Sequence, residues 1–257
     1  MPLPEFHRKS LLFTAALTFI ASPLLAQSAA PSFDVATVKQ HQGMISMIGV
    51  VNTPDGVKAT ASLPMLVQYA YGLPTSNQIA GTPDWGTAAT FDVQAKMSAA
   101  DIEAMGKMTP AEQKAFRASM MRSLLAERFK LKTHSESKPS PVYELVVAKG
   151  GPKMSAATSA SQGIRFQRDT SKVMDYSMEA FAEFLSSPAT RLGRPVIDKT
   201  GLTGKYDFDL NWSVYMTSPE DQGVIFGALG EVGLKLQSAT DPVETVFIDH
   251  AEQPAKE

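Results

Sequence analysis

The sequence predicts an α+β protein in which helices pack against mainly antiparallel sheets. Residues 91–97 and 206–212 each alternate strictly between apolar and polar side chains, as half-buried strands do. An amphipathic helix with a capping residue precedes each of these strands, and another follows it. The same order (helix, turn, strand, helix, strand, strand) occurs twice, which predicts two similar sub-domains that arose by internal duplication.

The first sub-domain is predicted to span residues 33–153. Ser62 caps a helix that runs to about Gly72, and the Gly/Pro-rich turn 81–86 leads into the strand at 91–97. A helix near 98–108 has no counterpart later in the chain. The next helix begins with a capping box at 109–112, and the half ends in an apolar strand at 142–148.

The second sub-domain, residues 163–252, is predicted to follow the same plan. Ser177 caps its first helix, a glycine turn precedes the strand at 206–212, and residues 218–221 repeat the capping box. Its last strand is expected at 243–248. A Gly/Ala/Ser-rich linker at 154–162 joins the sub-domains, and residues 253–257 form a tail. Matching positions differ by 117 residues (Phe91 and Phe208) and later by 105 (Leu131 and Leu236), a drift that loops absorb.

Residues 1–26 predict a cleavable secretory signal peptide. Arg8 and Lys9 precede an apolar run at 11–25, which is shorter than the roughly 20 residues of a membrane-spanning helix. Cleavage is expected between residues 26 and 30. The mature chain is therefore expected in the periplasm or secreted, with no permanent membrane span.

Composition narrows the classes of function. The chain has no cysteine, so neither a disulfide framework nor a lipid-modified cysteine is available. It carries 24 basic and 26 acidic side chains, and cleavage after Ala26 removes two basic and one acidic, leaving 22 and 25. This slightly negative net charge lacks the excess of basic residues that is typical of nucleic-acid-binding proteins.

One string resembles known catalytic motifs. Asp198, Thr200 and Gly201 match part of the phosphorylated motif of P-type ion pumps and part of the aspartic protease motif. The pump motif fails at Leu202, and the protease motif lacks the second copy that a carboxylate pair requires. A tight turn explains the string better, with Asp198 and Thr200 bonding the backbone and Gly201 and Gly204 at positive φ.

Other residues give little support for catalysis or metal binding. Asp207 shares a strand face with Asp209, which is normal for solvated carboxylates. The histidines of the mature chain, His41, His134 and His250, lie far apart and lack metal-site spacing. The sequence contains no Gly-x-Ser-x-Gly elbow. We therefore predict no cofactor, no metal and no catalytic residue.

Two features favour binding instead. Trp85 lies in the turn at 81–86, and Tyr69 and Tyr71 lie on the preceding helix, so these aromatics would form a ligand or partner surface. The alternative is that they anchor the turn to the core. A gap between the two sub-domains would also form a natural groove.

Several segments together resemble a known family. They are 33–39, 69–72, 78–85, 124–131, 141–153, 193–208 and 246–250. They are similar to the soil-associated protein family that is common in acidobacterial genomes, a domain of unknown function whose members are mostly exported. Some similar domains are fused to membrane sensor-peptidases of the BlaR type. The resemblance implies an extracytoplasmic sensing or interaction role and supplies no catalytic residues.

The sequence thus predicts an exported binding, interaction or sensing module whose partner is an unidentified envelope or extracellular ligand or protein. The alternative is a secreted hydrolase with a non-standard site, in which Asp198, Asp207 or a histidine meets a nucleophile. A purely structural envelope protein also remains open.

Overall fold

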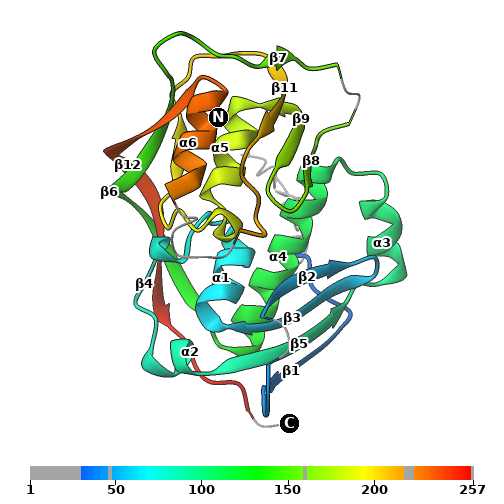
Figure 1. Ribbon diagram of the computed structural model, residues 1–257. Helices are drawn as coiled ribbons and strands as arrows, with labels where there is room; N and C mark the ends of the chain where they lie inside the picture. Colours follow the sequence, from blue (N-terminus) through cyan, green and yellow to red (C-terminus); the bar gives the residue numbers. More distant parts are fainter. Residues whose placement is uncertain (1–29, 46–47, 159–160, 217–222, 256–257) are drawn as a thin grey trace, which may run out of the picture.

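The computed structural model describes residues 30–45, 48–158, 161–216 and 223–255. It is an α+β protein, as predicted, and its described residues form three sheets covered by helices (Figure 1). We call β1 to β6 the first half and β7 to β12 the second half. The predicted signal peptide and the predicted capping box at 218–221 lie outside the described residues.

Each half contains a four-stranded antiparallel sheet. The first has the order β1-β5-β3-β2, formed by Val35–Gln40, Thr90–Lys96, Gly56–Ser62 and Gly49–Thr53. The second has the order β7-β11-β9-β8, formed by Ser155–Ala156, Lys205–Leu210, Ser171–Ser177 and Gly163–Phe166. The predicted strands at 91–97 and 206–212 are confirmed as β5 and β11, and β7 lies within the predicted linker.

A long two-stranded ribbon joins the halves. Strands β6 (Lys132–Val147) and β12 (Leu234–His250) pair antiparallel over almost their whole length, with Pro139 opposite Pro242. The short strand β10 (Val196–Asp198) of the second half pairs with β6, and β4 (Ile79–Ala80) of the first half pairs with β12. Each half therefore adds a strand to the long strand of the other, along the left side of Figure 1.

Both ribbon strands are longer than predicted. The predictions 142–148 and 243–248 cover only the C-terminal parts of β6 and β12. Residues 133–141 are exposed for most of their length and include two prolines, so they carry no apolar alternation. Pairing with the partner strand, and not local pattern, makes this segment a strand.

The helices begin mostly where the sequence predicts. They are α1 (Leu63–Tyr71), α2 (Asp84–Ala88), α3 (Ala99–Met105), α4 (Pro110–Arg128), α5 (Met178–Ser186) and α6 (Val224–Glu231), with short 3-10 helices η1 (Ser76–Gln78) and η2 (Pro188–Thr190). The first capping box is confirmed, because Thr109 and Glu112 bond reciprocally at the start of α4. The Ser177 hydroxyl accepts a hydrogen bond from the Ala180 N–H at 3.2 Å. The predicted hydroxyl cap at Ser62 is wrong, since Ser62 precedes α1 without such a bond.

The predicted turn at 81–86 also differs from the structure. Gly81 does turn the chain at a φ of 74°, but α2 begins three residues later and holds Trp85. The predicted glycine at the end of α1 is confirmed, with Gly72 in the left-handed conformation.

The halves share their hydrophobic cores. The core of the first half includes Val246 and Ile248 from β12. The core of the second half includes Leu145 from β6. Each core therefore contains residues from the long strand of the other half, so the two cores depend on each other for packing. Within the part of the chain described here, no helix has the length and apolar character that crossing a membrane requires.

Candidate functional site

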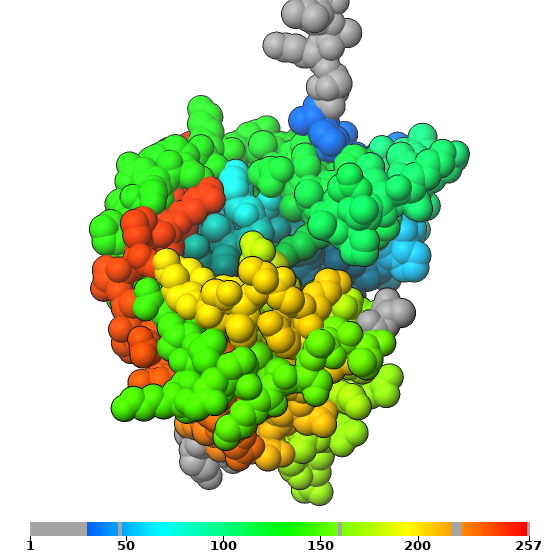
Figure 2. Space-filling model, turned by 90° about the horizontal axis from the view of Figure 1, so that it is seen from above, coloured from blue at the N-terminus to red at the C-terminus, as the bar shows by residue number. Residues whose placement is uncertain are grey.

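A cleft runs between the two halves and has two sections. The acidic section, about 630 Å³, lies between α5, β10, the η1 region and β12, and it is lined by Pro74, Gln78, Ser177, Glu179, Ala180, Ala182, Glu183, Ser186, Pro195, Val196, Ile197, Asp198, Val243 and Glu244. The apolar section, about 470 Å³, lies between β2, α1 and the end of α5. Pro74 and Glu183 line both sections. In Figure 2 the surface is hollowed where cyan residues of the first half meet yellow residues of the second.

Helix α5 supplies two carboxylates to the acidic section. Its buried face consists of Met178, Phe181, Ala182 and Leu185, which pack into the second core. Glu179 and Glu183 are four residues apart and therefore lie on one side of the helix, where both are exposed. Burial of the apolar face fixes the direction of these carboxylates.

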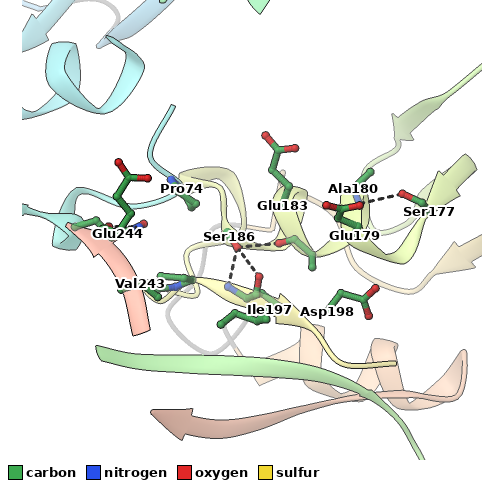
Figure 3. A pocket seen from close by; sticks show the side chains of 14 residues that line it. Pro74, Ser177, Glu179, Ala180, Glu183, Ser186, Ile197, Asp198, Val243 and Glu244 are labelled. Carbon is green, nitrogen blue, oxygen red and sulfur yellow. Dashed lines mark hydrogen bonds between the residues drawn. The ribbon is translucent and has the colours of Figure 1, made fainter. Parts of the chain in front are cut away.

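Two further carboxylates come from strands. Asp198 ends β10, and Glu244 is exposed between the buried residues Val243 and Thr245 of β12. The described residues that line the acidic section include no lysine, arginine or histidine. Figure 3 shows these four carboxylates, which belong to three elements: α5, β10 and β12. Because the charges of these carboxylates add within one cleft, this section has a negative potential that favours cations.

Ser186 forms part of the floor and has a structural role. It is 3% exposed, and its Oγ accepts a hydrogen bond from the Val196 N–H at 2.7 Å. The same hydroxyl lies 2.8 Å from the Ala182 carbonyl oxygen, to which it donates (Figure 3). The hydroxyl thus ties α5 to β10, and no histidine lines this section to activate it.

Polar contacts bridge the halves beside the cleft. Lys114 of α4 forms an ion pair with Glu183 at the junction of the two sections. The Gln78 side chain donates to the Glu244 carbonyl oxygen at 2.9 Å, and Asn77 donates to the Gly193 carbonyl oxygen at 2.9 Å. These contacts connect the first half to the second half beside the cleft.

The three aromatic residues that the sequence singled out all pack against the first core, but each makes different further contacts. Tyr69 lines the apolar section and donates to Asn52 Oδ1 at 2.6 Å. Burial raises the pKa of its hydroxyl, and the charge of Arg117 partly offsets this. Tyr71 instead bonds Thr133 at 2.6 Å, with the Arg122 guanidinium over its ring.

Trp85 belongs to the first core. Its ring stacks on Phe129 and meets Phe91 edge-on, with centroid distances of 6.4 and 6.1 Å. The anchoring role that the sequence allowed for the aromatics therefore fits Trp85. Of the three, Tyr69 alone is a lining residue of the cleft.

The Asp198 string forms the expected tight turn. The Thr200 N–H donates to Asp198 Oδ1 at 2.8 Å, and the Leu202 N–H donates to Thr200 Oγ1 at 3.1 Å. Gly201 has a φ of 69°, as predicted. The same prediction for Gly204 is wrong: its φ is not positive, and the Tyr206 ring packs against it.

Asp207 is not simply solvated as expected. Its Oδ2 accepts a hydrogen bond from the Thr158 N–H at 2.9 Å, and its Oδ1 accepts one from the Asp175 N–H at 2.8 Å. Asp175 has a φ of 56° at an irregularity in the pairing of β9 with β11. The carboxylate therefore holds a strained strand position and the β7 segment together.

The histidines each bond a different carboxylate. His41 contacts Asp92 at 2.9 Å, His134 contacts Asp249 at 2.7 Å, and His250 contacts Glu252 at 2.9 Å. Burial raises the pKa of Asp92, but hydrogen bonds from Thr60 and His41 outweigh it, so the pKa is lowered. Within the described ranges, no group of three or more His, Cys, Asp or Glu residues could hold a metal ion.

The acidic section is not among the sites that the sequence predicts. The sequence indicates only that Glu179 and Glu183 lie on the polar side of a helix. No pattern of neighbouring residues links them to Asp198 or Glu244. A spacing of four on the side opposite an apolar face was the available signal.

Comparison with known families identifies the chain at the level of its domain. Residues 64–251 match the model of the family described as Protein of unknown function (DUF3738). The chain belongs to this family. The DUF3738 match runs from α1 to the end of β12 and includes every residue that lines the acidic section. No curated protein and no solved structure matches the chain.

Proposed function

We propose that this DUF3738 protein is an exported binding module, active in the periplasm or outside the cell, whose ligand occupies the cleft between the halves. The observation that carries the proposal is the acidic section. Within the described part of the chain, the side chains of Glu179 and Glu244 have no ion-pair partner, although both line a cavity of about 630 Å³. That volume is typical of ligand sites.

Three further points support this proposal. The N-terminal sequence has the pattern of a secretory signal, which supports export. The family resemblance includes domains fused to BlaR-type sensor-peptidases, which supports a role in sensing envelope or extracellular ligands. The shared order of the two four-stranded sheets supports origin by duplication, which creates a cleft at the junction.

The hydrolase alternative has less support. It needs Asp198, Asp207 or a histidine beside a nucleophile. Asp198 lies in the ribbon sheet and Asp207 in the sheet of the second half, and each bonds the backbone of a nearby segment.

Site-specific photo-cross-linking tests the binding role. We would replace Ala180, which lines the acidic section, with p-benzoylphenylalanine and irradiate the purified protein in envelope extract. The matched control carries the same residue at Ala88, which is exposed on α2. Adducts specific to position 180 support the proposal, and equal labelling from both positions, or none, contradicts it.

Fractionation tests export separately. Expressed from its full sequence, the protein should appear in the periplasm or medium with a new N-terminus after residue 26 to 30. A full-length chain that retains Met1 in the cytosol would contradict this part of the proposal.

A further inference from the structure

We infer that the cleft binds an extended peptide that carries lysine or arginine next to an apolar stretch. This inference names the ligand class of the proposed function and rests on it. It draws on the charge of one section, the apolar lining of the other, and the strand that borders the second.

The charge of the acidic section selects a cationic group. Glu179, Glu183, Asp198 and Glu244 line it together with no described cationic residue. Carboxylates that share a partly enclosed space attract cations more strongly than isolated surface carboxylates do. The same charges disfavour phosphates, nucleic acid and anionic lipid.

The protein itself shows that an ammonium group fits here. Lys114 reaches from α4 of the first half to Glu183 of the second half, at the point where the two sections meet. Both side chains are more than 60% exposed, so this pair is weakly held and open to competition. A ligand lysine would take the place of Lys114 on Glu183.

The apolar section accepts the neighbouring part of such a ligand. Met65, Leu73 and Pro188 contribute to its lining, with the ring of Tyr69 beside them. An apolar pocket directly beside a negative one fits a chain in which an apolar side chain adjoins a basic one. An inorganic cation or a simple polyamine would leave the apolar section unused.

The border strand favours a peptide main chain. Among the described strands, β2 is the last of its sheet and pairs with β3 alone, so its outer edge has main-chain N–H and C=O groups that no described strand pairs. Gly49 and Val50 of β2 line the apolar section. An extended peptide can bond this edge as an added strand and place alternate side chains in pockets.

Peptide titration tests the inference. The probe is a fluorescein-labelled peptide of sequence Val-Thr-Val-Thr-Lys-Thr-Lys, followed by fluorescence anisotropy. Matched probes carry glutamate or Nε-acetyl-lysine in place of both lysines. We expect the lysine peptide to bind at least tenfold more tightly than either matched probe and to weaken as salt is added.

Variants locate the binding. The triple change Glu179→Gln, Glu183→Gln and Glu244→Gln should weaken binding of the lysine peptide at least tenfold. The matched triple change Glu103→Gln, Glu127→Gln and Glu252→Gln removes three exposed carboxylates elsewhere and should change it less than twofold. All six side chains are exposed, so circular dichroism should show both proteins folded.

A competition variant sharpens the test. Lys114→Met frees Glu183 and should tighten binding of the lysine peptide severalfold, whereas Lys107→Met, in the exposed turn after α3, should not. Equal losses in the two triple variants, or equal binding of lysine and acetyl-lysine probes, overturn the inference. Adducts from position 180 together with no binding of the lysine peptide also overturn it, and leave the proposed binding function standing.

Discussion

Helices α1 and α5 bury the same positions and differ at the positions that carry the two carboxylates of α5. Counted from Ser62 and Ser177, the first, fourth, fifth and eighth positions are buried in both helices: Leu63, Leu66, Val67 and Ala70 in α1, and Met178, Phe181, Ala182 and Leu185 in α5. The second and sixth positions are Pro64 and Gln68 in α1 but Glu179 and Glu183 in α5. Packing therefore accounts for the shared positions, and it does not account for the carboxylates.

The short ribbon strands differ in the same way. β4 is followed by Gly81, whereas β10 ends at Asp198, 117 residues later, the same offset that separates Phe91 from Phe208. An added Cβ at Gly81 would lie 2.6 Å from the Ile248 carbonyl oxygen, so the first half excludes a side chain there. At these matching positions the first half therefore has neutral residues, and at Gly81 no room for a side chain, whereas the second half has carboxylates.

The largest expected effect tests whether the halves depend on each other. Leu145→Ala leaves a cavity in the second core, although Leu145 belongs to β6 of the first half. We expect a loss of about 2–5 kcal/mol in the free energy of unfolding. The chain has two tryptophans, Trp85 in the first half and Trp212 in the second, so single-tryptophan variants report each half during urea unfolding.

Both tryptophans should report the same lowered midpoint. Lys235→Ala, exposed on β12, is the control and should change the free energy of unfolding by less than about 0.5 kcal/mol. If Leu145→Ala moved the Trp212 transition and left that of Trp85 in place, the halves would be independent.

A smaller effect compares two turns. Gly81→Ala should destabilise the protein by about 3 kcal/mol, because it combines a φ of 74° with a backbone clash. Gly201→Ala has a similar φ of 69° and open space around its Cβ, so about 1 kcal/mol is expected. Thermal unfolding of both variants gives the order, and equal losses would remove the claim of a close contact at Gly81.

The helix caps should differ between the halves. Ser177→Ala removes a hydroxyl that accepts the Ala180 N–H, at a cost of about 1 kcal/mol. Ser62→Ala removes no such bond and should cost less. Urea midpoints measured side by side decide this, and the reverse order would contradict the capping assignment.

The smallest effect concerns α4, which has a capping box, and α6, for which the described residues supply no side-chain cap. Hydrogen bonds from the Thr109 N–H and hydroxyl lower the pKa of Glu112. A lowered folded-state pKa gives stability that is present above the unfolded-state pKa and lost as the pH falls through the folded-state value. Wild type should therefore lose more stability on acidification than Glu112→Gln, and parallel pH profiles would show that the charge contributes nothing.

The sequence was informative where a single element determines its own structure. Alternation at Phe91 and Phe208 located β5 and β11, and the Thr109 capping box located the start of α4 to the residue. Asp198 and Thr200 predict the turn in which they lie, because their side chains bond the backbone two residues ahead.

Pairing between distant segments was not readable in the same way. The middle of β6 has Pro139 and Pro141, and only its partner β12 makes it a strand. The acidic section also depends on distant segments. Glu179 of α5 lines the same cavity as Asp198 of β10 and Glu244 of β12. The sequence predicts a turn at Trp85, since its stacking partner Phe129 lies 44 residues later in the chain and gives no local signal.

Hydrogen exchange measured by mass spectrometry tests most directly whether the cleft is the binding site. Exchange would be compared with and without saturating lysine peptide. We expect slower exchange in β2, α5, β10 and the residues around Glu244, with α2 and α3 unchanged. Slower exchange confined to α2, α3 or the outer sheet edges at β1 and β7, or no change anywhere, would contradict it.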